Sequence, residues 1–277
     1  MATIVDVARL AGVTPTTVSR VINNRGYISE KTKKRVHEAM DELGYQPNEI
    51  ARSLTKQKSN TIGVIVPHIS HPYFAKLISN LENEAAKKDY KIILCNSKEK
   101  AEKEKQYLDM CKSNRVAGII ICSGNVESNK INTGGIPVVL LEKNFEEGKL
   151  GIQCDNYQGG KLATEHLIEC GCKKILHLSG VIDEEMPADN REKAFIDVCS
   201  KNEIEYFIKK YDIDTYNQMN YYDYIKAALN EIEGVDGIFA SSDLIAAQVI
   251  QVCNEIKIRI PEDIKLVGFD DVDISQL

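Results

Sequence analysis

The first residues with a chemical pattern lie on one face of a short predicted helix that begins at Pro15. Thr14 followed by Pro15 is typical of a helix start, because the threonine hydroxyl caps free N–H groups and a proline there sacrifices no helical hydrogen bond. The polar face of this helix carries Pro15, Thr16, Thr17, Ser19, Arg20 and Asn23. Small hydroxyl side chains and one arginine suit a helix in the major groove of DNA, where arginine can donate two hydrogen bonds to guanine.

A second set of polar and aromatic residues follows predicted strands in the remainder of the chain. It comprises His71, Tyr73, Phe74, Ser123, Lys143, Asn190, Arg191, Phe195, Asp243 and Asp270. Aromatic rings can cover the C–H face of a sugar, while Asp, Asn and Arg side chains bind its hydroxyl groups. These residue types favour a carbohydrate site. Core packing is an equally good interpretation of Phe195, and a solvated loop is the alternative for His71.

The DNA-facing helix needs a small scaffold, and the first 45 residues provide one. Thr3 and Asp6 have capping-box spacing, and the helix that they open ends at Gly12. Ser29 caps a third helix, which ends at Gly44. Two short helices joined at a glycine are typical of a helix-turn-helix. A minimal unit of three helices is therefore predicted.

The remainder of the chain alternates apolar runs with amphipathic helical stretches. The runs are Ile62–Val66, Lys91–Cys95, Gly118–Cys122, Val138–Leu141, Ile175–Leu178, Gly237–Ala240 and Lys265–Gly268. This alternation predicts an α/β fold whose parallel sheets are covered by helices on both faces. Such sheets bind ligands at the carboxyl ends of their strands, which is where the sugar-site candidates lie.

The charge of the chain changes near residue 58. Residues 1–58 contain ten Lys and Arg against six Asp and Glu, a net charge of +4, whereas the whole 277-residue chain carries −6. All eight cysteines follow residue 58. A small basic segment on a larger acidic one favours contact between nucleic acid and the basic segment.

Other classes of function find little support in the sequence. No dinucleotide, P-loop, zinc-protease or nucleophile-elbow motif is present, so we expect no enzyme, no catalytic residues and no cofactor. His68 and His71 lie three residues apart without further ligands, which argues against a metal. The sequence has no signal peptide and no apolar run near 18 residues, so we expect a cytoplasmic protein without membrane contact, with buried reduced thiols. A transport-type solute binder is the least favoured alternative.

Five segments closely resemble the LacI/GalR family of bacterial transcription repressors. They are Ile4–Asn23, Gly44–Leu54, Thr61–Pro67, Cys154–Gly160 and Val267–Asp271. They match the headpiece, hinge helix and body of the family in the right order and span nearly the whole chain. The resemblance implies a helix-turn-helix headpiece over residues 1–45 and a hinge helix with linker over 46–59. It also implies a periplasmic-binding-protein-like body of two doubly wound parallel-sheet subdomains, residues 60–148 and 149–277.

The resemblance also assigns contacts with double-stranded operator DNA. Pro15, Thr16 and Arg20 would lie at base edges. Phosphates would be contacted by Thr3, Thr14, Thr17, Asn23 and Ser29, although simple capping explains any single Ser or Thr as well. In the hinge, Asn48, Ala51 and Leu54 would enter the minor groove, with Leu54 pushed between base pairs as a wedge. An ordinary linker leucine is the alternative for Leu54.

The implied function is that of a sugar-responsive repressor acting as a homodimer. An effector, a sugar or sugar phosphate, would bind between the two subdomains and change operator affinity, and Arg191 and Asp270 match effector-contacting positions most closely. Many sugar-responding members have Asp-Arg where this chain has Glu142-Lys143. Lysine lacks the planar fork of arginine. The alternative is control by a partner protein, such as the phosphocarrier protein of the sugar phosphotransferase system.

Family members continue for roughly fifty residues past the Gly268–Asp271 motif, whereas Leu277 ends this sequence. The resemblance therefore implies that the C-terminal segment of the family is lacking and that the second subdomain is incomplete. We expect the two lobes then to be less constrained, because one crossing between them replaces three.

The hinge assignment predicts the effect of Leu54→Ala. Removing the only large wedge residue should leave the headpiece folded but weaken operator binding and reduce DNA bending. Fluorescence energy transfer between labelled DNA ends measures the bend. An unchanged bend angle would count against the wedge.

Overall fold

A computed structural model describes residues 2–46, 59–122, 133–143, 150–181 and 186–276. The chain divides into two compact units, Met1–Ser59 and Asn60–Leu277. The predicted hinge helix, including Asn48, Ala51 and Leu54, lies outside the described residues, as does Ser123.

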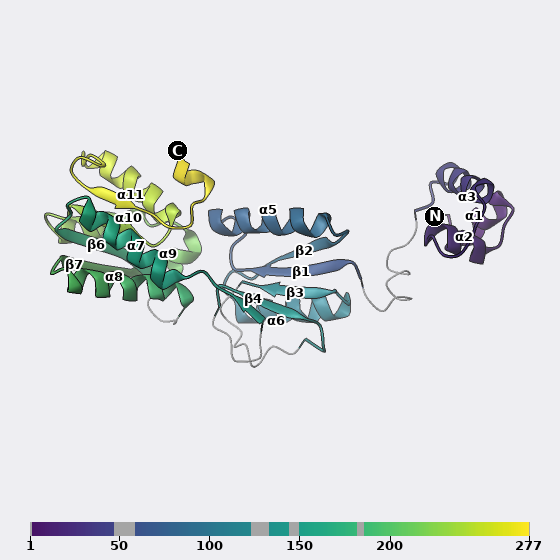
Figure 1. The fold of residues 1–277 in the computed structure, drawn as a ribbon, viewed down its shortest axis with the longest axis horizontal. Helices are drawn as coiled ribbons and strands as arrows, with labels where there is room; N and C mark the ends of the chain where they lie inside the picture. The colour runs from purple at the N-terminus through teal and green to yellow at the C-terminus, as the bar shows by residue number, and fades with distance from the viewer. Residues whose placement is uncertain (1, 47–58, 123–132, 144–149, 182–185, 277) are drawn as a thin grey trace. The chain divides into compact units, whose positions relative to one another are not determined.

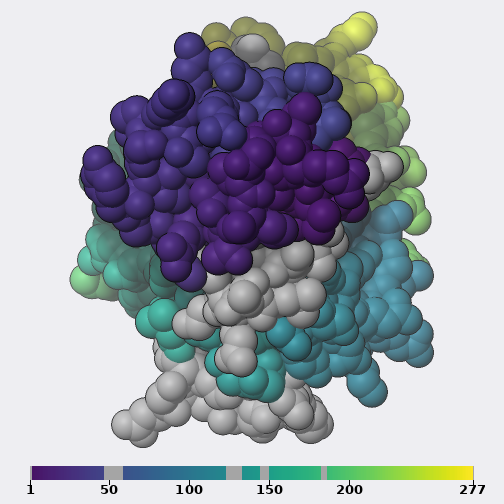
Figure 2. Space-filling view, turned by 90° about the vertical axis from the view of Figure 1, so that its right-hand side faces the viewer, coloured from purple at the N-terminus to yellow at the C-terminus, as the bar shows by residue number. Residues whose placement is uncertain are grey.

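The first unit consists of α1 (Ile4–Ala11), α2 (Pro15–Ile22) and α3 (Glu30–Glu42). All three predicted caps are confirmed, because the side chains of Thr3, Thr14 and Ser29 each accept from the backbone N–H three residues on. Its core is small and consists of Val7, Ala8, Ala11, Val18, Val21, Val36 and Ala39. In Figure 2 the residues up to Gln46 form one continuous packed surface in purple.

Gly12 makes the turn between α1 and α2. Its φ of 61° lies in the left-handed region, which favours glycine. A Cβ atom there would stand 2.7 Å from a guanidinium nitrogen of Arg35, which donates to the carbonyl oxygens of Ala11 and Gly12. The third helix thereby fixes the helix-turn-helix geometry.

The second unit contains two parallel sheets (Figure 1). The first has the order β2-β1-β3-β4-β5 and consists of Thr61–Val66 (β1), Lys91–Asn96 (β2), Gly118–Ile121 (β3), Val138–Leu141 (β4) and Leu150–Ile152 (β5). The second has the order β7-β6-β8-β9 and consists of Lys174–Val181 (β6), Glu205–Tyr211 (β7), Gly237–Ala240 (β8) and Lys265–Val267 (β9). We call the two sheets with their helices the first and second lobes.

Helices cover both faces of each sheet, as the apolar runs predicted. In the first lobe, α5 (Pro72–Ala86) packs on one face and α6 (Ala101–Ser113) on the other. In the second lobe, α7 (Asn156–Glu169) and α8 (Asn190–Lys201) cover one face. The opposite face is covered by α10 (Tyr222–Glu231) and α11 (Asp243–Glu255). The short helices are η2 (Pro187–Asp189), α9 (Ile213–Gln218) and η3 (Asp273–Gln276).

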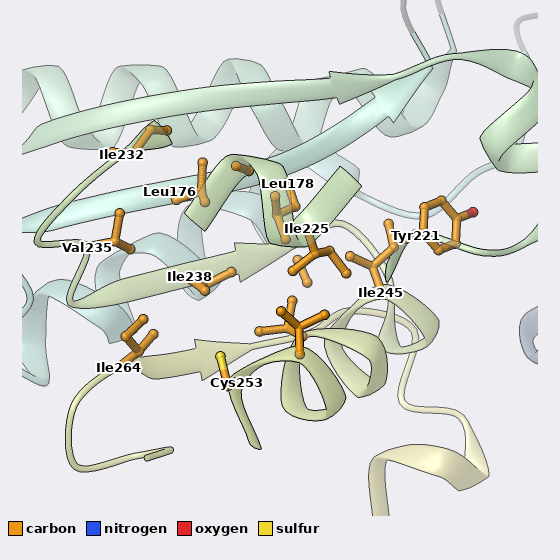
Figure 3. Close-up of a cluster of buried hydrophobic side chains, with 14 of the residues drawn as sticks. Leu176, Leu178, Tyr221, Ile225, Ile232, Val235, Ile238, Ile245, Cys253 and Ile264 are labelled. Atoms are coloured by element: carbon orange, nitrogen blue, oxygen red, sulfur yellow. The ribbon is translucent and has the colours of Figure 1, made fainter. Parts of the chain in front are cut away.

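The largest apolar cluster lies between the second sheet and α10 and α11. Figure 3 shows Leu176, Leu178 and Ile238 pointing from the sheet toward Ile225 and Ile245 on these helices. These five side chains have no exposed surface. Six of the eight cysteines are also buried, and all eight are free thiols.

Two strands were missing from the prediction. β5 has only three residues and is largely exposed, and β7 is a half-exposed edge strand with the mixed sequence EYFIKKY. Neither forms the continuous apolar run that marks a central strand. Because β5 pairs with β4, the first sheet extends to Ile152, past the subdomain boundary expected after residue 148.

A close helix contact in the second lobe predicts that Gly160→Ala is destabilising. A Cβ on Gly160 would stand 2.6 Å from the backbone oxygen of Arg191 and 2.7 Å from its Cα, so α8 or α7 would have to shift. We expect a net loss on the order of 1–3 kcal/mol, despite the better helix propensity of alanine. Urea unfolding followed by circular dichroism measures it.

Gly180→Ala is the matched control, since the nearest atom to its Cβ lies at an ordinary 3.6 Å. Equal stability of the two variants would contradict the close contact.

Candidate functional site

The DNA-facing candidates on α2 divide into exposed and half-buried residues. Pro15, Thr16 and Arg20 are exposed, as a base-reading role requires. Thr17 is half-buried, and its hydroxyl lies 2.9 Å from that of Thr14. Asn23 is half-buried and donates to the carbonyl oxygen of Ser19 at 2.7 Å, so its amide closes the end of α2.

The three capping residues use their hydroxyls locally. Thr3 donates to the Asp6 carboxylate at 2.7 Å, and this carboxylate also accepts from the Thr3 backbone N–H. The hydroxyl of Ser29 lies 2.9 Å from that of Thr32. Capping therefore accounts for the hydrogen bonds that these hydroxyl groups make in the free protein. Their contacts with DNA phosphates stay a prediction.

Tyr27 was not among the predicted contact residues. It lies in the turn between α2 and α3, and it is 99% exposed. Single exposed apolar side chains are common on protein surfaces, so this exposure alone assigns Tyr27 no role.

One sugar-site candidate, Arg191 at the start of α8, holds its guanidinium group through several contacts. Its Nε donates to Asn156 Oδ1 at 2.8 Å, and one terminal nitrogen donates to the carbonyl oxygen of Ser241 at 2.6 Å. The guanidinium plane lies over the ring of Phe269, 3.5 Å from its centroid. The side chain is only 12% exposed, so these contacts replace most of its hydration.

Glu142 joins this group from the end of β4. One of its carboxylate oxygens accepts from the backbone N–H of Cys154 at 2.6 Å, and the other from the Asn156 amide at 3.2 Å. We call Glu142, Asn156, Arg191, Phe269 and Asp270 the arginine cluster. Its members come from β4, from the starts of α7 and α8, and from the segment after β9.

Asp270 faces Arg191, with 3.7 Å between its carboxylate and the guanidinium. The carboxylate is 8% exposed. Burial, with smaller contributions from Asp243 and Glu142, raises its pKa to about 7 against the opposing effect of Arg191. The carboxyl group therefore titrates near neutral pH.

Two glycines allow the cluster to pack. A Cβ on Gly159 would meet the ring of Phe269 at 2.7 Å, and Gly160 brings the backbone of Arg191 against α7. The two glycines of the Cys154–Gly160 motif thus allow Phe269 and the backbone of Arg191 to approach α7 closely.

The first lobe contributes His71, Tyr73 and Phe74 from the start of α5. His71 caps this helix through Nδ1, which accepts from the Tyr73 N–H at 3.3 Å, and burial lowers its pKa to about 4. Burial and the nearby carboxylates Glu142 and Asp270 raise the pKa of Tyr73. Phe74 is 9% exposed and packs in the core between α5 and the first sheet.

The four other candidates are buried or half-buried. Phe195 has no exposed surface and packs against His177 and Phe239, so the carbohydrate assignment is wrong for this conformation and core packing holds. Asp243 is buried and accepts from the Val272 N–H at 2.9 Å, which anchors the segment after β9. Asn190 is half-buried. Lys143 is buried, and its carbonyl oxygen accepts from Gln153.

Two residues that follow β7 were not among the predicted site residues. Tyr216 and Asn217 on α9 meet His68 of the first lobe: Nε2 of His68 lies 3.0 Å from Asn217 Oδ1, and the rings of His68 and Tyr216 form an edge-to-face pair. Burial lowers the pKa of His68 and raises that of Tyr216. Because β7 lacks a continuous apolar run, the sequence does not mark the residues at its carboxyl end as site candidates.

Lys76 on α5 makes a second contact between the lobes. Its ammonium group donates to the carbonyl oxygen of Asp271 at 2.5 Å.

Among the described residues, no group of three His, Cys, Asp or Glu side chains has the geometry to hold a metal ion. Within the same residues, no helix is both long and apolar enough to cross a membrane.

The shifted pKa of Asp270 predicts a pH-dependent effect of Asp270→Asn. The folded state binds this proton more tightly than the unfolded chain, so ionisation costs the wild type stability as pH rises from 3.8 to about 7. Asparagine does not titrate. The variant should therefore gain stability relative to wild type across this window, by at most about 1.4 kcal/mol per pH unit.

Urea unfolding of both proteins at pH 5 and pH 8 measures the difference. Parallel changes in the two proteins would show that Asp270 is not responsible.

Comparison with known proteins agrees with this arrangement. Residues 3–48 match the lacI family of bacterial regulatory proteins, and residues 59–276 match the periplasmic binding proteins and sugar binding domain of the LacI family. The sucrose operon repressor of Streptococcus mutans is 38% identical over 270 residues, which are 98% of this chain and 82% of that protein.

Two solved structures are also similar. A periplasmic binding protein/LacI transcriptional regulator from Alkaliphilus metalliredigens, complexed with D-xylulofuranose, is 35% identical with a TM-score of 0.69, covering 79% of this chain and 80% of that chain. The lac repressor dimer bound to operator and the anti-inducer ONPF has a TM-score of 0.86 at 24% identity, covering 99% and 84%, and shows the same fold.

The chain therefore belongs to the LacI family of bacterial regulatory proteins, and it is a DNA-binding transcription repressor, not an enzyme, whose operator affinity is modulated by a small-molecule effector.

Proposed function

We propose that the effector is an uncharged sugar bound at the arginine cluster, and that it controls how tightly two paired copies of the chain hold their operator. The observation that carries the proposal is the pairing of Arg191 and Asp270 beside the ring of Phe269. A planar donor paired with an acceptor can bind neighbouring hydroxyl groups of a polyhydroxylated ring, and the Phe269 ring holds the donor in place.

The charges of the cluster favour an uncharged sugar over a sugar phosphate. Two carboxylates, Glu142 and Asp270, accompany Arg191, and two guanidinium nitrogens already donate to protein oxygens. A phosphate would meet the field of Glu142 and, for the fraction in which it is ionised, that of Asp270. The D-xylulofuranose complex of the Alkaliphilus relative supports an uncharged sugar, and the sucrose operon repressor supports control of a sugar operon.

The headpieces of two chains would read the two halves of a near-palindromic operator, with the hinge segments at its centre. The lac repressor dimer on its operator supports this arrangement. Sugar binding between the lobes would shift their relative position and change hinge pairing, a coupling typically of about 1–3 kcal/mol. The protein would act in the cytoplasm, where its eight free thiols stay reduced.

The test begins with operator selection from random duplex DNA by the full chain. The selected operator is then titrated with protein in the presence of sucrose, D-fructose, D-xylulose, D-ribose or their phosphate esters. One uncharged sugar should change the operator affinity several-fold, and Arg191→Ala should abolish that change without weakening sugar-free DNA binding.

Two outcomes would reject the proposal. A response only to a phosphate ester would reject the uncharged effector. A response to no sugar, but to a phosphorylated phosphocarrier protein, would establish partner control instead.

The exposed position of Arg20 predicts how the headpiece reads sequence. Arg20→Ala should weaken binding to the selected operator by about 1–3 kcal/mol and relax specificity at one base pair, because a bidentate contact to guanine is lost. Binding to random DNA should change much less. Gel-shift titrations on both DNAs measure this, with Arg9→Ala, an exposed arginine on α1, as control. Equal losses on both DNAs would remove Arg20 from base reading.

A further inference from the structure

We propose that Glu142 is a positioning residue for effector binding, because its carboxylate fixes the Asn156 amide in the orientation that holds Arg191. The inference deepens the proposed function, since it concerns how the same site is kept ready for a sugar. Glu142 itself need not touch the sugar.

The backbone places Glu142 at the junction of the two lobes. Its φ of 48° lies in the left-handed region, where an ordinary residue is held only at a cost. Its N–H donates to the carbonyl oxygen of Ile152 at 2.9 Å, which continues the pairing of β4 with β5 by one residue. The residue therefore belongs to the first sheet, while its side chain reaches toward the start of α7.

Both oxygens of the carboxylate are occupied by donors from the crossing between the lobes. One accepts from the Cys154 N–H at 2.6 Å and the other from Asn156 Nδ2 at 3.2 Å. An ionised carboxylate only accepts hydrogen bonds. It can therefore pair with the NH₂ end of the Asn156 amide but not with its oxygen.

The amide of Asn156 has one donor end and one acceptor end. Nδ2 also donates to the Cys154 carbonyl oxygen at 3.3 Å, so two acceptors specify the same orientation. Oδ1 is then directed to Arg191 Nε, from which it accepts at 2.8 Å. The side chain is 3% exposed, so water does not readily replace either partner.

The orientation matters because a flipped amide would present NH₂ to the guanidinium. Arg191 would lose its acceptor and face a donor in a site where the side chain is 12% exposed. The contacts with Ser241 and the ring of Phe269 would remain, but Nε would lose its acceptor, and the guanidinium would shift relative to Asp270. The charge of Glu142 thereby sets the position of a group that it does not touch.

The test exchanges the polarity of the pair. In Glu142→Gln, the new amide can still accept from Cys154, but its NH₂ end opposes the NH₂ end of Asn156. In the double variant Glu142→Gln with Asn156→Asp, the introduced glutamine donates to one oxygen of the introduced aspartate, and the other oxygen of that aspartate accepts from Arg191. The double variant keeps the net charge of the wild type.

The first readout needs no sugar. The Nε–H resonance of Arg191, assigned by its loss in Arg191→Lys, should shift in Glu142→Gln, exchange faster with water, and return toward its wild-type position in the double variant. Glu165→Gln removes an exposed carboxylate on α7 that faces Lys161 and is the matched control. Urea unfolding of each variant identifies any that fails to fold. In that case the Nε–H resonance is compared among the variants that do fold, including the double variant.

The second readout is D-xylulose binding by calorimetry. Glu142→Gln should weaken binding by about tenfold or more, as expected for a lost hydrogen bond to a charged group, and the double variant should recover most of it. An unchanged Nε–H resonance in Glu142→Gln would overturn the inference. A double variant that binds D-xylulose no more tightly than Glu142→Gln would overturn it as well. Failure of the wild type to bind D-xylulose would count against the sugar, and the resonance would still test the positioning role.

Discussion

The candidate site of the second unit is arranged around the buried guanidinium group of Arg191. A guanidinium that is 12% exposed has lost most of its hydration, and such a loss is tolerated only where hydrogen bonds and opposite charge replace the water. Arg191 finds these replacements in Asn156, Ser241, Phe269 and Asp270, which lie on separate elements of the fold or in the segments that follow them. The site consequently depends on the strand order and on the close packing of α7 on α8 that Gly160 permits. A shift of any of these elements changes the position of the charge.

The same charge connects the two lobes. Glu142 belongs to the first sheet by its backbone, and its carboxylate accepts from Asn156, which in turn accepts from Arg191. His68 with Asn217 and Lys76 with Asp271 form further polar contacts between the lobes. A ligand that changes the pairing of Arg191 therefore acts where the lobe positions are set. The headpiece is built differently, from local caps and a small core, as its short length allows.

Features that depend on neighbouring residues in the sequence were predicted more completely than features that depend on tertiary packing. The caps Thr3, Thr14 and Ser29 and the seven apolar runs depend on neighbouring residues and on periodicity, and the structure has them where expected. β5 and β7 were not predicted, because an exposed edge strand needs no continuous apolar run. With β7 unpredicted, Tyr216 and Asn217 were missed as well. Phe195 and Asp243 follow strands as site residues do, but only the tertiary packing shows that one lies in the core and the other anchors a loop.

The central claim is that a sugar at Arg191 and the operator at α2 are energetically coupled. Coupling between two binding sites is reciprocal, so the factor by which sugar changes operator affinity must equal the factor by which operator changes sugar affinity. The most direct measurement is the dissociation constant of the sugar for the free protein and for the operator-bound protein, by calorimetry. The account predicts constants that differ by roughly 5- to 150-fold and match the shift in operator affinity. Identical constants in the two states would contradict it.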